Sequence, residues 1–143
     1  MPHRLRDHLA VLVLACLLPA VAPACSAKTA TRQAATGPTV ADGLGNLRDM
    51  FRQAAAGKAT LPKSATEFTA VEPLYPVAGP FVLAGAIDCA WGAGLKEGVA
   101  AAAAKRLAWD KGAAEAGGWV LFQDGTIREV TAAEFAAAAK ATP

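Results

Sequence analysis

Four acidic side chains in the second half of the chain are the residues that could do catalytic chemistry. Two carboxylates that lie close together can act as general acid and base in the hydrolysis of a glycan. The candidates are Asp88, Glu97, Asp110 and Glu115. Their spacing does not by itself bring them together, and surface carboxylates are usually solvated. A small carboxylate-dependent hydrolase acting on envelope polymers is therefore the alternative prediction, and the main prediction is that these side chains are solvated or cap helices.

Other catalytic devices are missing from the sequence after its amino-terminal segment. The two histidines are His3 and His8, so no later residue can supply the imidazole of a Ser-His-Asp site, a Cys-His site or a histidine metal site. No Cys-x-x-Cys pair is present. The glycines at 92–94 could form a phosphate-binding loop, but Glu97 stands where the dinucleotide fingerprint needs a small residue. The sequence thus predicts no catalytic residue, no cofactor and no metal.

The amino terminus has the order of a secretory signal peptide. Arg4 and Arg6 precede an uncharged run over residues 9–21, and the small residues 22–24 follow. This order predicts a signal peptide over residues 1–24, with cleavage after Ala27 as the alternative. The uncharged run is shorter than the roughly 20 residues that a membrane-spanning helix needs. We therefore expect an exported product, periplasmic or extracellular.

Cys25 and Cys89 are the cysteines that remain after the signal peptide. The apolar run and the small residue before Cys25 permit lipidation, which would anchor the protein in a membrane, although Pro23 is unfavourable at its position. A disulfide between Cys25 and Cys89 is the other interpretation. Cys89 also suits a small buried position, so all three interpretations stay open.

Two tryptophans and one aspartate are the candidate partner-binding residues. Trp91 and Trp119 lie beside glycines, and an exposed tryptophan can anchor a partner, although both also suit core packing. Asp88 follows the apolar run 81–87, which indicates a strand end, a helix cap or a binding site.

The charge of the chain limits its partners. The formal net charge falls from +2 to +1 once Arg4, Arg6 and Asp7 are removed, so no nucleic-acid partner is expected. A nearly neutral domain has little long-range field, which favours apolar contact with another protein or an envelope polymer and a weak dependence on salt. The apolar stretch 78–104 contains recurring glycines, and a membrane-active segment is therefore a further interpretation. The charged residues Asp88 and Lys96 within it disfavour this interpretation.

The first half of the domain is predicted from apolar spacing and prolines. Residues 25–41 form a flexible tether rich in alanine and threonine. An amphipathic helix follows, capped by Asp42 and ending near Gly57. Prolines between 61 and 80 exclude a long helix there. Within this stretch, residues 67–72 show weak alternation that predicts an edge strand. The apolar run 81–87 is predicted as a buried strand.

The second half has the strongest local signals. The alanine-rich stretch 95–116 predicts a helix that packs against the similar run 136–139. Asp124-Gly125 predicts a two-residue hairpin turn within 119–130, with Val120, Phe122, Ile127 and Glu129 on the core face. Thr131 and Glu134 predict a capping box that opens a final helix anchored by Phe135. Together these elements predict a single small α+β domain over residues 42–141.

The function predicted on these grounds is that of an exported, non-enzymatic binding or accessory protein of the cell envelope or extracellular space. Inhibitor, immunity and lipoprotein-like proteins belong to this class.

Overall fold

A computed structural model describes residues 37–96 and 98–143 of the chain. Its described strands form one antiparallel sheet in the order β1-β2-β3-β4. The strands are β1 (Ile87–Cys89), β2 (Arg106–Asp110), β3 (Gly118–Phe122) and β4 (Ile127–Val130). The described helices are α1 (Val40–Ala55), α2 (Ala65–Phe68), η1 (Glu72–Leu74), α3 (Ala78–Leu83), η2 (Ala101–Ala103), α4 (Ala113–Ala116) and α5 (Ala132–Ala137). This is the α+β class that the sequence predicts.

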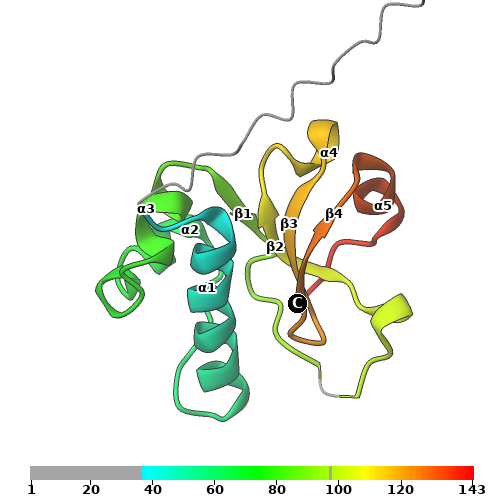
Figure 1. Ribbon diagram of the computed structural model, residues 1–143. Helices are drawn as coiled ribbons and strands as arrows, with labels where there is room; N and C mark the ends of the chain where they lie inside the picture. The colour runs from blue at the N-terminus through cyan, green and yellow to red at the C-terminus, as the bar shows by residue number, and fades with distance from the viewer. Residues whose placement is uncertain (1–36, 97) are drawn as a thin grey trace, which may run out of the picture. The chain divides into compact units, whose positions relative to one another are not determined.

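Helices cover both faces of the sheet (Figure 1). Ile87 is buried beside Gly43 of α1, whereas the Trp109 ring contacts the Phe135 ring of α5. Asp88 lies opposite Trp109 in the pairing of β1 with β2, so Ile87 and Trp109 point to opposite faces. The α1 face and the α5 face are the names used below for these two sides.

Helix α1 is the amphipathic helix that the sequence predicts. Its buried residues are Gly43, Leu44, Leu47, Met50 and Phe51. The predicted cap is wrong, because Thr39 rather than Asp42 precedes the first turn. The Thr39 hydroxyl accepts a hydrogen bond from the backbone N–H of Asp42, whose carboxylate accepts one from the Thr39 N–H. Asp42 thus serves at the third helical position of a capping box.

Two predicted strands are helical instead. Residues 67–72 are occupied by the end of α2, a turn and the start of η1, because the Ser64 hydroxyl caps α2 by accepting from the N–H of Glu67. The first three residues of the run 81–87 end α3, the next three form a turn, and only Ile87 enters β1. Pro80 stands in the first turn of α3, where its missing N–H costs no hydrogen bond. Strand β1 lies at an edge of the sheet, not at its centre.

The predicted alanine-rich helix over 95–116 is also wrong. This stretch contains η2, strand β2 and the single turn α4. Strand β2 lies between β1 and β3, and its Leu107 and Ala108 are fully buried. Burial between two strands therefore outweighs the helix propensity of the alanines before it. The expected proximity to 136–139 is present, since the Arg106 N–H donates to the Ala139 carbonyl at 2.8 Å.

The carboxyl-terminal hairpin is present, but its register differs from the prediction. The Phe122 N–H donates to the Thr126 carbonyl, so the loop has three residues, with Gly125 at a positive φ of 83°. Leu121 consequently lies opposite Ile127, and the second strand is shifted by one position. Val130 is buried and Glu129 is exposed, which reverses the predicted core face on this strand.

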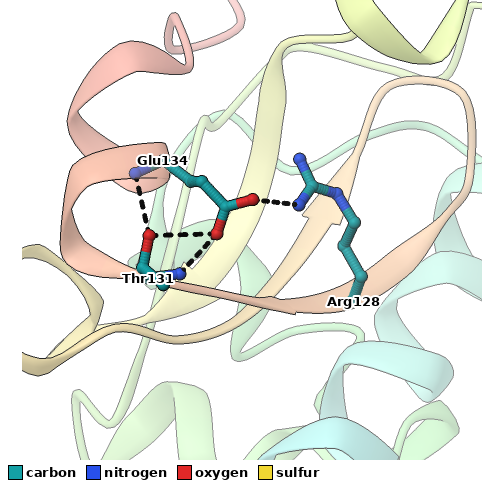
Figure 2. A network of polar contacts seen from close by, with 3 residues as sticks. All are labelled: Arg128, Thr131 and Glu134. Carbon is teal, nitrogen blue, oxygen red and sulfur yellow. Dashed lines mark hydrogen bonds and ion pairs between the residues drawn. The ribbon is translucent and has the colours of Figure 1, made fainter.

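Helix α5 begins with the predicted capping box (Figure 2). The Glu134 N–H donates to the Thr131 hydroxyl at 3.2 Å, and the Glu134 carboxylate accepts from the Thr131 N–H at 2.8 Å. Phe135 is the buried anchor of the helix. These contacts hold α5 against the sheet at the place where the candidate site lies.

Candidate binding site

The structure places the three predicted partner-binding residues in different surroundings. Asp88 is exposed in the middle of β1, and therefore is neither a helix cap nor at a strand end. Trp91 follows in the next loop, half-buried, with its ring centre 5.9 Å from that of Phe68. Trp119 lies on β3 at the position opposite Glu129 and points to the other face of the sheet from Asp88.

A groove of about 360 Å³ lies beside Trp91. Residues 89–91 line one side of it, and residues 140–143 line the other. Strand β2 holds both sides, because the Ala90 N–H donates to the Leu107 carbonyl and the Ala141 N–H donates to the Arg106 carbonyl. The segment around Lys140 forms a parallel bridge with Arg106. The groove is therefore framed by backbone pairing rather than by loose loops.

Lys140 extends from this groove to a group of stacked cations and rings. We call the group the cation–aromatic cluster and define it as Arg106, Trp109, Phe135 and Lys140. The Arg106 guanidinium carbon lies 3.9 Å from the centre of the Phe135 ring and 5.2 Å from that of Trp109. The Lys140 ammonium lies 5.5 Å from the centre of the Trp109 ring. Each cation is thus held by the negative face of an aromatic ring.

Arg106 differs from the neighbouring Arg128 in its lack of an acidic partner. Arg128 lies over the Phe122 ring and reaches the Glu134 carboxylate at 3.4 Å. Figure 2 shows its contact with Glu134. Arg106 has no ion pair with any residue in 37–96 or 98–143, and its buried Nε has no hydrogen-bond partner there. Burial lowers the pKa of its guanidinium, which nevertheless remains charged.

Sequence reasoning did not find this cluster. Arg106, Trp109 and Lys140 fall in stretches predicted to be helical or left without a role. The short apolar run over 107–109, bounded by charged residues, was the available signal for a buried strand. A strand there would have placed Arg106 and Trp109 on the sheet.

Two of the carboxylates proposed for hydrolysis, Asp88 and Asp110, lie on opposite faces of the sheet. Asp110 lies opposite Ile87 and so points to the α1 face, whereas Asp88 points to the α5 face. Asp110 accepts a hydrogen bond from the Gly112 N–H at 2.9 Å, and Glu115 is exposed on α4. Glu97 lies outside the described residues. No group of three or more potential metal ligands occurs within 37–96 and 98–143.

Cys89 is buried in the core, with an exposed fraction of 5%. Burial, reinforced by the negative charge of Asp88, raises the pKa of its thiol to about 12, so the thiolate is disfavoured at neutral pH. Cys25 lies outside the described residues. Its lipidation and its pairing with Cys89 therefore stay predictions, as does the signal peptide.

Comparison with protein-family models, with curated proteins and with solved structures gave no match. Among the described residues, none of the helices has the length and apolar character needed to cross a membrane. The function therefore has to be argued from the groove and the cluster.

Proposed function

We propose that the chain is an exported, non-enzymatic binding or accessory protein of the cell envelope or extracellular space, in the manner of an inhibitor, an immunity protein or a lipoprotein. It binds another protein, or an envelope polymer, at the groove beside Trp91. The observation that carries this proposal is the position of a half-buried tryptophan on a groove that the cationic residue Lys140 also lines.

Physical reasons support this surface as the contact. A tryptophan that keeps part of its ring accessible contributes a large contact area with few rotatable bonds. Its packing against Phe68 fixes the ring before the partner arrives, so little side-chain entropy is lost on binding. The groove has the size of a site for one large side chain or a short peptide segment.

Export is the part of the proposal that rests on the sequence alone. The charged, apolar and small-residue order of residues 1–24 supports it. Mass spectrometry of the protein from its native host should find residues 1–24 removed. A diacylglycerol adduct on Cys25 would identify a lipoprotein, whereas a full-length product in the cytoplasm would contradict export.

The binding proposal is tested by replacing the two tryptophans in parallel. The partner is first isolated by cross-linking the tagged protein in the envelope and extracellular fractions, then purified. Trp91→Ala should weaken its binding by about 2 kcal/mol or more, as expected for an anchor residue. Trp119→Ala is the matched control, because Trp119 is also half-buried but does not line the groove.

Folding must be measured with binding, because Trp91 touches the core. Circular dichroism and the melting temperature of each variant supply this measurement. Lys140→Glu is a second variant that keeps the contact of Trp91 with Phe68 while reversing a charge at the groove. Undiminished binding by folded Trp91→Ala and Lys140→Glu proteins would refute the proposed site.

A further inference from the structure

We infer that the cation–aromatic cluster binds a carboxylate group, supplied by an acidic peptide segment of the partner. This inference rests on the proposed function, because Lys140 belongs both to the cluster and to the wall of the groove beside Trp91. It goes further by assigning the chemical class of the group that is recognised. The residues that would carry the recognition are Arg106 and Lys140.

The first argument is the state of the Arg106 side chain. Its Nε is buried without a hydrogen-bond partner in the described residues, and its guanidinium has no carboxylate partner there. The terminal nitrogens of the guanidinium are not among the buried unpartnered atoms, and their N–H groups can donate to the oxygens of an anion. An anion at these nitrogens would supply the counter-charge that Arg106 lacks within the described residues.

The second argument is that the guanidinium is already oriented. Its distance of 3.9 Å from the centre of the Phe135 ring places it against that aromatic side chain. Phe135 is itself held by α5, whose first turn is fixed by the Thr131 and Glu134 capping box. A guanidinium held in this way loses little freedom when it binds a planar carboxylate.

The third argument is that the nearby acids do not neutralise the cluster. Glu134 is occupied, since its carboxylate accepts from the Thr131 N–H and hydroxyl and contacts Arg128 (Figure 2). Asp88 is exposed on the strand next to Trp109, but it forms no ion pair with Arg106 or Lys140. Two cations near the Trp109 ring therefore remain available to an external acid.

The same two acids favour a carboxylate over a phosphate as the ligand. Asp88 and Glu134 would repel a dianion more strongly than a monoanion. A flat guanidinium also matches the two oxygens of a carboxylate in a bidentate pair. The contact is short-range, so it is compatible with a nearly neutral domain that has little long-range field.

The inference is tested by titrating the purified protein with a capped triglutamate peptide and following the ¹⁵N–¹H signal of the Arg106 side chain by nuclear magnetic resonance. A capped triglutamine peptide and inorganic phosphate are the comparison ligands. We expect saturable displacement of the Arg106 signal by triglutamate alone at concentrations where the other two have no effect. Backbone signals near Trp109 and Lys140 should move with it.

Variants locate the binding. Lys140→Gln, an exposed substitution, should weaken triglutamate binding about tenfold, the loss expected for one charged hydrogen bond. Arg106→Lys keeps the positive charge but removes the planar fork, so it should weaken binding to a similar degree. Lys58→Gln is the matched control, because Lys58 is exposed in the turn after α1, and it should bind triglutamate as the parent does.

The inference is overturned if triglutamine or phosphate binds as well as triglutamate, or if Lys58→Gln weakens binding as much as Lys140→Gln does. The same holds if triglutamate produces no saturable change. That failure is separate from a failure of the proposed function, since partner binding is measured through Trp91→Ala. If Trp91→Ala abolishes partner binding while triglutamate does not bind the parent protein, the groove remains the binding site and only the carboxylate assignment is refuted.

Discussion

The guanidinium carbon of Arg106 lies 3.9 Å from the centre of the Phe135 ring, which joins the central strand β2 to helix α5. Trp109 completes the contact, with its ring centre 6.1 Å from that of Phe135 and an angle of 66° between the planes. Edge-to-face packing of this kind adds to the burial of both rings. The contact that orients Arg106 for a ligand therefore also fixes α5 on the sheet.

The stacked contact predicts an energetic coupling between Arg106 and Phe135. Phe135→Leu should lower the free energy of unfolding by about 1–2 kcal/mol, because the smaller side chain leaves space and cannot stack. In a double-mutant cycle with Arg106→Gln, the two changes should couple by about 0.5–1 kcal/mol. Urea unfolding of the four proteins measures this coupling. Strictly additive effects would show that the stacking contributes nothing.

The capping box of α5 predicts a loss of stability in acid. Hydrogen bonds from the N–H and hydroxyl of Thr131 lower the pKa of Glu134 below its usual 4.5. The folded state then binds fewer protons than the unfolded state. This contribution is complete above about pH 4.5 and is lost as the pH falls through the lowered pKa. Asp42 acts in the same direction in the capping box of α1, through its hydrogen bonds from Thr39.

Melting temperatures measured between pH 7 and pH 3 check this expectation. Glu134→Gln can keep part of the capping box but cannot titrate, so the stability difference from the parent should shrink towards pH 3. Thr131→Ala removes a hydroxyl donor that lowers the pKa of Glu134, so the melting temperature of this variant should also depend less on pH than that of the parent. A constant difference between parent and Glu134→Gln across this range would contradict the assignment.

Burial of Cys89 predicts a thiol that is protected in the folded protein. Because its pKa is raised to about 12, iodoacetamide at pH 8 should label it slowly in native protein and rapidly in urea. Because the pKa of the thiol is raised above its usual 9.0, its contribution to stability is complete below about pH 9 and is lost as the pH rises towards 12.

The same labelling, followed by mass spectrometry, tests the predicted disulfide with Cys25. If the exported protein carries that bond, Cys89 should resist labelling even in urea until a reductant is added. Labelling in urea without reductant would exclude the bond.

Local signals explain which elements could be predicted from the sequence. The apolar spacing of α1, the Asp-Gly turn and the Thr131 capping box each act within a few residues, so they indicate structure without knowledge of the fold. The same locality limits their precision. The hairpin was found, but its loop has three residues rather than two, and that single residue moves Val130 into the core and Glu129 out of it.

The candidate site was only partly accessible to such reasoning, because it depends on distant pairing. Asp88 and Trp91 were singled out from their neighbours in the sequence, and the structure places Asp88 exposed on β1 and Trp91 on the groove. Arg106 and Lys140 are 34 positions apart and meet only because the segment after α5 pairs with the start of β2. The alanines at 100–104 suggested a helix there. Strand β2 is determined by its pairing with β1 and β3, and no local sequence pattern indicates that pairing.

Two glycines in the carboxyl-terminal half predict a clear order of stability. Gly117 and Gly125 both have a positive φ, near 77° and 83°, which side chains rarely adopt. Their surroundings differ, because a Cβ at Gly117 would lie 2.5 Å from the Val130 carbonyl oxygen, whereas at Gly125 the nearest atom, on Leu95, would be 3.9 Å away. Gly125→Ala should therefore cost about 1 kcal/mol, from backbone strain alone.

Gly117→Ala should cost clearly more, about 2–4 kcal/mol, because the backbone around Val130 and Thr131 must also move. Gly45→Ala is the matched control, since this position lies within α1 with no atom near the added Cβ. It should stabilise the protein by about 0.5–1 kcal/mol. Urea unfolding of the three variants gives the order directly. Equal losses at Gly117 and Gly125 would show that the chain between α4 and β3 does not lie against Val130 as described.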